Sequence, residues 1–177
     1  MGFFMNSIPS PEECIKLLKS KGCSKKVINH CIAVTNVAVK IAEKANADVE
    51  LVEASALLHD IGRCRTHGIT HAIEGVKIAR ELGLPKNIVK IIERHIGAGL
   101  PKEEAKKLGL PVKNYIPKTL EEKIVCHADS LTENSRKQKI EKEVKRALKN
   151  NHKEYAYRLL ALHKELSDIC GIDIDEL

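Results

Sequence analysis

The sequence predicts an all-α fold in a single domain, and three observations support this prediction. Apolar residues recur every three or four positions along most of the chain, which is the period of an amphipathic helix. Capping residues precede these segments, and no segment shows a convincing strand pattern. The chain has 177 residues, of which 43% are hydrophobic. That length suits one domain with a substantial core, whereas two domains would be cramped.

The N-terminal third predicts three helices. The segment 10–13 offers a serine N-cap, a proline at the first helical position and a capping-box glutamate, and a second helix begins near Ser24. His30 falls beside the apolar stripe of that second helix. A third helix, capped by Asp48, delivers His59 and Asp60 at its end. Neighbours on a regular helix project about 100° apart, so both can face one metal only from a helix end or a bent turn. Gly62 is expected to supply such an end, because glycine tolerates the left-handed backbone that closes helices.

The middle of the chain predicts two further helices, each with a histidine at one end. Thr70 precedes a helix that places His71 in its first turn, and we prefer His71 to His67 as a ligand. Pro85 opens the next helix, which reaches His95. The proline-rich stretch 98–118 then contains one short helix. Such a long connection is either a lid or specificity loop or a plain surface excursion.

The C-terminal part predicts a helix from Thr119 that carries Asp129, followed by a helical pair over 137–177. The first helix of the pair is strongly basic. The second runs from about 154 to 170 and has as its apolar seam Leu159, Leu162, Leu166 and Ile169. Such a pair either caps the core or forms an oligomer contact. His127 is turned away from Asp129 on a regular helix and is interpreted as a structural or supporting residue.

Composition narrows the class of protein. The net charge of +6 favours acidic ligands such as nucleotides or RNA, although many basic surfaces bind neither. The six cysteines form no C-x-x-C pair, so we interpret them as reduced thiols of a cytoplasmic protein. The apolar start, residues 1–5, is too short for a signal peptide, and no stretch has the length of a membrane span.

The order of the histidines and aspartates resembles a known family. His30, the pair His59-Asp60 and Asp129 are similar to the H…HD…D signature of the HD-domain metal-dependent phosphohydrolases. His71 and His95 fall where the two-metal branch of that family carries extra histidines. The stretch 122–129 resembles the E-K-I-x-x-x-A-D motif of bacterial HD-type diadenosine tetraphosphate hydrolases. The similarity covers about residues 24–136 and implies an HD-domain helical bundle, with 137–177 as a packed C-terminal extension.

The resemblance implies a ligand set for two divalent metal ions. His30, His59 and Asp129 would hold the first ion, His71 and His95 the second, and Asp60 would bridge them. Iron, manganese, cobalt, nickel and zinc all suit these nitrogen and oxygen donors.

Two arginines are the candidate phosphate-binding residues. Arg63 replaces the lysine of the family motif and offers bidentate contacts to phosphate, but it cannot serve as a proton donor. Arg136 resembles an arginine of the tetraphosphate hydrolases, although its spacing is one residue longer.

These features predict a metal-dependent phosphohydrolase that cleaves a phosphate ester or anhydride, with Asp60 and Arg63 as catalytic residues. The expected partner is a phosphorylated small molecule of the nucleotide or dinucleoside polyphosphate class, without membrane contact and with a homo-oligomer possible. The alternative is a nucleotide- or RNA-binding HD module with weak or no hydrolase activity. Its RNA contact would be the basic helix within 137–149. A metal oxygenase on the same scaffold is a third possibility.

Overall fold

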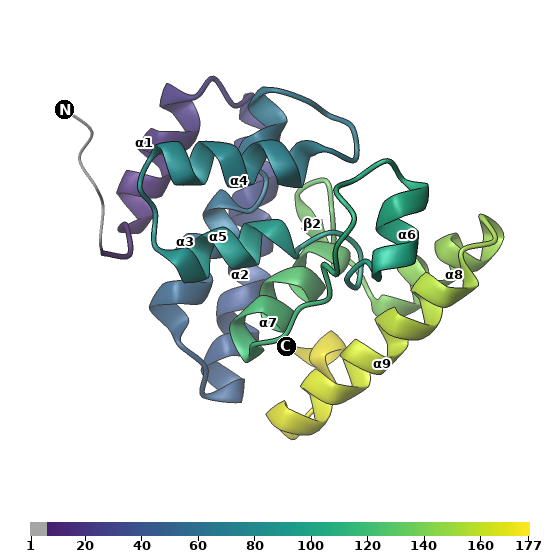
Figure 1. The fold of residues 1–177 in the computed structure, drawn as a ribbon. Helices are drawn as coiled ribbons and strands as arrows, with labels where there is room; N and C mark the ends of the chain where they lie inside the picture. Colours follow the sequence, from purple (N-terminus) through teal and green to yellow (C-terminus); the bar gives the residue numbers. More distant parts are fainter. Residues whose placement is uncertain (1–6) are drawn as a thin grey trace.

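Helix α2 (Lys25–Ala45) is the central element of the computed structural model, which describes residues 7–177 (Figure 1). The Ser24 side chain accepts a hydrogen bond from the Val27 backbone nitrogen at its start, and Asn46 ends it with a left-handed backbone at φ 54°. Helices α3 (Val49–Leu58), α7 (Leu120–Ser130) and α9 (Lys153–Cys170) all pack against α2. The fold is therefore the predicted all-α bundle. The apolar start, residues 1–5, lies outside the described residues.

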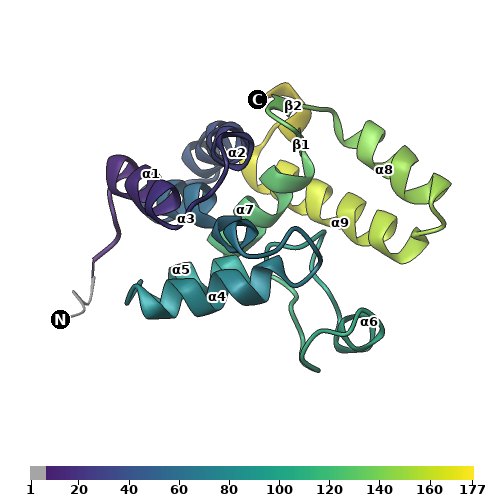
Figure 2. The ribbon, with the colours of Figure 1, turned by 90° about the horizontal axis from the view of Figure 1, so that it is seen from above.

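The remaining elements surround this centre. α1 covers α3, α4 packs on α5 and on the short helix η1, and α8 pairs with α9 (Figures 1 and 2). Their bounds are α1 (Pro11–Ser20), η1 (Ile61–Cys64), α4 (His71–Glu81), α5 (Lys86–Glu93), α6 (Lys102–Lys107), α8 (Ile140–Lys149) and η2 (Ile174–Glu176). One core of Leu, Ile, Val, Ala and Cys side chains joins α1, α2, α3, α5, α7 and α9. None of the helices among residues 7–177 combines the length and the apolar character that crossing a bilayer requires.

Local sequence signals explain most helix boundaries, and three details differ from expectation. The capping box at α1 is present, with Ser10 and Glu13 each accepting a backbone hydrogen bond from the other. Thr70 precedes α4, but its side chain makes no cap. Ile169, expected in the apolar seam of α9, is 46% exposed. A two-residue antiparallel hairpin of β1 (Thr132–Glu133) and β2 (Arg136–Lys137) was not expected, because each strand is too short to show alternation.

The stretch 98–118 is an ordered excursion with a small core of its own. Leu100, Ala105, Leu110 and Tyr115 are buried together and pack against residues of α4 and of the segment after α5. Lys113 forms an ion pair with Glu93, which fastens the excursion to α5. This part of the chain therefore holds α6 at a fixed place beside α9 (Figure 2).

Candidate metal centre

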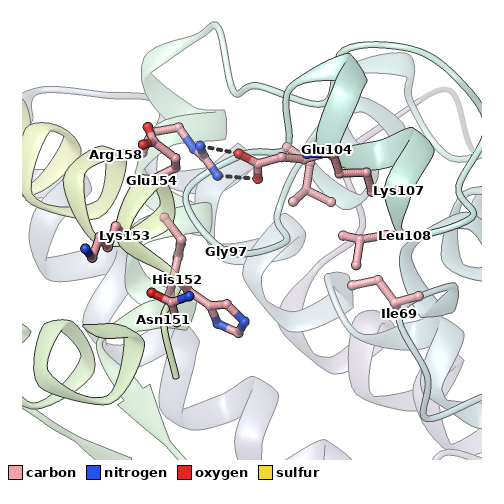
Figure 3. A pocket seen from close by; sticks show the side chains of 12 residues that line it. Ile69, Gly97, Glu104, Lys107, Leu108, Asn151, His152, Lys153, Glu154 and Arg158 are labelled. Carbon is pink, nitrogen blue, oxygen red and sulfur yellow. Dashed lines mark hydrogen bonds and ion pairs between the residues drawn. The ribbon is translucent and has the colours of Figure 1, made fainter. Parts of the chain in front are cut away.

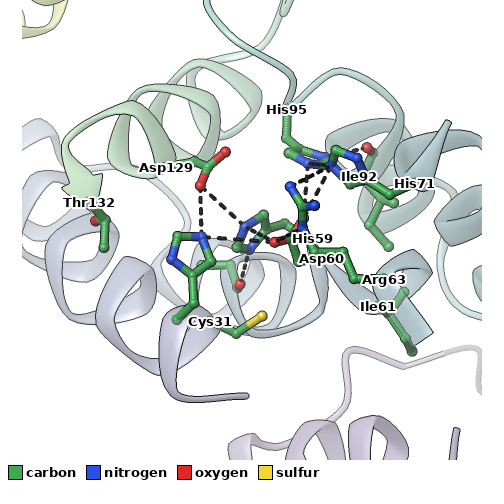
Figure 4. Close-up of polar contacts among 12 residues, drawn as sticks. Cys31, His59, Asp60, Ile61, Arg63, His71, Ile92, His95, Asp129 and Thr132 are labelled. Atoms are coloured by element: carbon green, nitrogen blue, oxygen red, sulfur yellow. Dashed lines mark hydrogen bonds and ion pairs between the residues drawn. The ribbon is translucent and has the colours of Figure 1, made fainter. Parts of the chain in front are cut away.

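The six side chains predicted to bind metal lie together in the structure, although they come from five separate segments (Figure 4). They are His30 on α2, His59 and Asp60 after α3, His71 at the start of α4, His95 after α5 and Asp129 near the end of α7. We call them the His/Asp cluster. Most of these residues are buried, and His30 and Asp129 are partly exposed, so the cluster is open to solvent on that side.

A change of helix type lets His59 and Asp60 face the same point. Helix α3 ends at Leu58, His59 is its C-cap, and Asp60 leaves the helical region at φ −99° and ψ 15°. The chain then tightens into the 3-10 helix η1. The expectation that the pair needs a helix end is confirmed.

Gly62 was expected to supply that helix end through a left-handed backbone, and this is wrong, because it lies within η1 without positive φ. Its role is to provide space. A Cβ atom at this position would lie 1.8 Å from the backbone oxygen of His71 and 2.5 Å from the nitrogen of Gly75. Only a residue without a side chain allows η1 to approach α4 so closely. That approach brings His71 next to Asp60.

All four histidines of the cluster are oriented in the same way. Their Nδ1 atoms lie 2.7–2.9 Å from backbone oxygens, three of them from the residue three positions earlier in the chain. A backbone oxygen can only accept, so each Nδ1 carries a proton, and Nε2 is the atom that presents a lone pair when the ring is neutral. This backbone support fixes both the tautomer and the ring orientation, as it does in metal-binding histidines generally.

The two oxygens of Asp60 face different pairs of histidines. Oδ1 lies 3.2 Å from His71 Nε2 and 3.5 Å from His95 Nε2. Oδ2 lies 3.7 Å from His59 Nε2 and 3.9 Å from His30 Nε2. The carboxylate thus stands between two groups of nitrogen donors.

Asp129 joins the first of these groups. Its Oδ1 lies 3.0 Å from His30 Nε2 and 3.5 Å from His59 Nε2. The side of the cluster with His30 and His59 therefore has two carboxylates close by, and Asp129 also lies within 4.8 Å of a ligand atom of His95.

The nitrogen and oxygen atoms of the cluster repel one another unless a cation lies between them. His71 Nε2 and His95 Nε2 lie 3.0 Å apart although both carry lone pairs. Among residues 7–177, His59 Nε2 and Asp60 Oδ1 are buried without a hydrogen-bond partner. Unpaired buried acceptors are costly unless something positive satisfies them. Nitrogen and oxygen donors without a thiolate suit divalent metals, and the cluster can hold such an ion.

The electrostatics of the cluster agree with this interpretation. Burial opposes ionisation of Asp60, but His59 and the other facing histidines hold the pKa of its carboxyl well below the usual range. The pKa of His59 is raised well above its ordinary value by Asp60 and Asp129, although burial opposes this. The carboxylates therefore favour a positive charge among these atoms, which a proton or a metal ion can supply. Burial lowers the pKa of His95, which keeps that ring neutral.

The Arg63 guanidinium lies directly beside the cluster. Its Nε donates to Asp60 Oδ2 at 2.5 Å, and its NH1 donates to the backbone oxygen of His67. The side chain is 30% exposed, so it can also reach a ligand in solvent. Arg136, the other arginine predicted to bind substrate, lies exposed on β2. It lines neither of the two surface hollows that flank the cluster.

Two hollows flank the cluster, and Arg63 and His67 line both of them. The His30-side hollow, of about 310 Å³, also includes Lys26 and Asn134. The His95-side hollow, of about 320 Å³, extends to Ile69 and Gly97. Access to the cluster is therefore along a surface and not through a single narrow entrance.

The structure adds supporting residues that sequence patterns did not identify. Arg94 donates to both carboxylate oxygens of Glu122 at 2.9 and 2.8 Å, and both side chains are largely buried. This pair ties the end of α5 to the start of α7 and thereby sets His95 against Asp129. The spacing of residues in the sequence does not show that two residues so far apart form a pair. The only local signal was the acidic residue in the first turn of α7.

The basic helix proposed as an RNA contact is largely neutralised. Lys142 and Arg146 pair with Glu133, and Lys145 pairs with Glu141. Lys137 donates to backbone oxygens of the C-terminal residues 174–177. These contacts support the interpretation of α8 as a solvated helix face.

Comparisons with known proteins identify the fold and relatives of the chain. The HD domain model matches residues 27–134. The HD domain of the phosphodiesterase PgpH from L. monocytogenes superposes with a TM-score of 0.54 over 89% of this chain and 97% of that one, at 19% identity. That likeness concerns the fold alone.

Relatives of higher identity are named for RNA modification. The tRNA (cytidine(56)-2'-O)-methyltransferases of Thermoplasma volcanium and Picrophilus torridus are 48% and 44% identical over 96% and 99% of this chain. The chain spans about half the length of these two proteins, 50% and 52%. An uncharacterized protein of Methanocaldococcus jannaschii is 45% identical over 89% of this chain and 97% of its own length.

These relatives overturn part of the functional prediction. Proteins with 44–48% identity are named as tRNA methyltransferases, so a nucleotide phosphohydrolase as the main function, and a phosphorylated small molecule as the partner, are contradicted. The error was to infer a hydrolysis reaction from the predicted metal ligands. The same fold with the same ligands can serve several activities. The resemblance to diadenosine tetraphosphate hydrolases is likewise not supported. What stands is the superfamily: the chain belongs to the HD-domain family.

Proposed function

We propose that this chain is an RNA-binding HD module that binds the tRNA during its modification. We also propose that its His/Asp cluster holds two divalent metal ions. His30, His59 and Asp129 are assigned to one ion, His71 and His95 to the other, and Asp60 to both. The bound ions would supply concentrated positive charge for a phosphate of the RNA backbone. Iron, manganese, cobalt, nickel and zinc remain candidates for the metal.

The relatives support RNA as the partner. Residues 27–134 of this chain, which the HD domain model matches, lie within the part that aligns with the Thermoplasma and Picrophilus proteins. Their names describe methyl transfer to a tRNA ribose, which requires a methyl donor. The lone pairs of the His/Asp cluster suit metal ions, and a metal ion bound there would attract a phosphate. We therefore assign contact with the tRNA to this chain, and not the transfer of the methyl group.

One observation carries the proposal: the Nε2 atoms of four histidines and both oxygens of Asp60 converge beside an arginine that solvent can reach. A metal would neutralise the carboxylates, and Arg63 would add two donors in a planar fork that matches phosphate. The net charge of +6 favours the approach of a polyanion to this surface.

The test compares two arginines that differ in position but little in exposure. Arg63 contacts the cluster and is 30% exposed, whereas Arg65 pairs with Glu74 and Glu81 and is 38% exposed. Binding of labelled tRNA to the metal-loaded protein would be measured by fluorescence anisotropy over a range of salt concentrations. We expect Arg63→Ala to weaken binding about tenfold, because a hydrogen bond to a charged group is worth about 1.5–3 kcal/mol.

The salt dependence adds a second readout. Loss of one phosphate contact should lower the slope of log affinity against log salt by about one. Arg65→Ala should keep both the affinity and the slope. Equal losses in the two variants, or tRNA binding that ignores both the metal and Arg63, would contradict the proposal. So would metal-dependent cleavage of the tRNA during the measurement.

A further inference from the structure

A third cavity continues the surface that leads away from the His/Asp cluster. This α6–α9 cavity lies between α6 and the start of α9 and has a volume of about 650 Å³ (Figure 3). It shares Ile69 and Gly97 with the His95-side hollow. That hollow shares Arg63 and His67 with the His30-side hollow. Each of the three spaces therefore adjoins the next beside the cluster, and we call them together the groove.

The walls of the α6–α9 cavity are mainly apolar, and the rings of His152 and Tyr155 are part of them. Ile69 and Leu108 form one side (Figure 3), and Tyr155 is also part of the lining. The Tyr155 hydroxyl donates to Glu143 Oε1 at 2.9 Å, which holds the ring in place. A Cβ atom at Gly97 would lie 3.3 Å from that ring, so the glycine, with φ 61°, lets backbone and ring approach. A flat apolar ligand suits such walls.

The cavity is preformed and does not depend on closure of a loop. Arg158 on α9 donates to both carboxylate oxygens of Glu104 on α6 at 2.7 and 2.6 Å (Figure 3). The small core of the 98–118 excursion supports α6 from behind. Because the walls are fixed before any ligand arrives, little ordering entropy opposes binding.

Positive charge lies at both ends of the groove. Lys26 lines the His30-side hollow, and Lys107 and Lys153 line the α6–α9 cavity. Within residues 7–177, these three lysines are exposed and take part in no ion pair. Polar groups of Asn151 and Glu154 at the same cavity could meet the edge of a base, since a carboxylate accepts from exocyclic amino groups.

We propose that this groove binds a single-stranded segment of RNA, with one phosphate at the His/Asp cluster and one unstacked base inside the α6–α9 cavity. This inference rests on the proposed function and specifies how that site recognises its partner. A single strand is required because a paired base is stacked and cannot enter an apolar cavity. Proteins commonly read such unstacked bases by stacking them on aromatic side chains.

The experiment separates base binding from backbone binding. The probes are a short oligocytidylate and an abasic phosphodiester chain of equal length and charge. The metal-loaded wild-type protein should bind the base-bearing probe about tenfold more tightly, because stacking of one base is worth about 1–3 kcal/mol. Leu108→Trp, whose larger side chain narrows the cavity, should lower this preference while leaving binding of the abasic chain unchanged.

A matched control tests whether any large substitution has the same effect. Leu160 on α9 is 44% exposed, against 46% for Leu108, and lines none of the three spaces. Leu160→Trp should keep the full preference, and circular dichroism would show that both variants are folded. Lys107→Glu provides a second variant, which should weaken binding of both probes.

Two results would overturn the inference in distinguishable ways. If the wild-type protein binds both probes equally, or if Leu108→Trp keeps the preference for bases, the cavity does not take a base and RNA binding at the cluster stands. If neither probe nor tRNA binds, the proposed function fails as well.

Discussion

Substitution of Gly62 by alanine should displace the start of α4 and disrupt the His/Asp cluster. The added Cβ would lie 1.8 Å from the backbone oxygen of His71, whereas ordinary contact begins at about 3.4 Å. That oxygen must therefore move by about 1.6 Å. His71 Nε2 is 3.2 Å from Asp60 Oδ1, so a shift of this size would separate the two groups.

The energetic cost should be large for one methyl group. The obstructing atoms belong to the backbone of a helix and cannot rotate away, so we expect a loss of about 3 kcal/mol, at the upper end of the range for overpacking. For a protein of this size that corresponds to a fall in melting temperature of about 6–12 °C. Thermal unfolding and metal content after purification without chelator would be measured together.

Gly68→Ala is the matched control for the unfolding measurement. A Cβ there would lie 3.6 Å from the nearest atom, Thr66 Oγ1, which is ordinary contact. This variant should unfold near the wild-type temperature. A Gly62→Ala protein with unchanged stability and unchanged metal content would refute the argument that Gly62 is required for the close approach of η1 and α4.

Three further predictions follow from buried groups. Arg94→Met should cost about 3–5 kcal/mol in urea unfolding, because it leaves the buried Glu122 carboxylate without its partner; a cost below 1 kcal/mol would show that the pair is unimportant. His95→Ala should reduce the metal content from two ions per chain to one or none, and an unchanged content would remove His95 from the ligand set. Burial raises the pKa of Cys14 to about 12, so this thiol should resist iodoacetamide at about pH 8 while the half-buried Cys64 reacts, as mass spectrometry of the digested protein can show.

The sequence was sufficient for the fold because local signals agree with it. Helix caps at Ser10, Ser24, Asp48 and Thr119 are all present in the structure. Apolar periodicity identified the faces that pack on α2. Where the signals were absent, prediction failed: Thr70 makes no side-chain cap, and the hairpin at 132–137 is too short to have a period. The prediction of a single domain remains a prediction.

The cluster could be anticipated because the order of its residues in the chain resembles the signature of the HD-domain family, whereas each histidine alone is ambiguous. The orientation of the four histidine rings could not be predicted, because it depends on which backbone oxygen lies beside each Nδ1 atom in the folded chain. The role of Gly62 as a point of close approach also needed the structure, because a spacing pattern does not show which backbone lies opposite. The α6–α9 cavity joins residues 69, 108 and 155, whose separation in sequence carries no signal. The reaction was predicted wrongly because donor atoms specify a metal more closely than a substrate.

The most direct test of the account is the affinity of tRNA for the protein with and without metal, in the wild type and in Asp60→Asn. At constant ionic strength, loading the wild-type protein with Mn²⁺ should strengthen tRNA binding. The Asp60→Asn variant should lose most of this gain, because Asp60 faces both groups of histidines. Tight tRNA binding that is equal in all four samples would contradict the claim that the RNA is held through the His/Asp cluster.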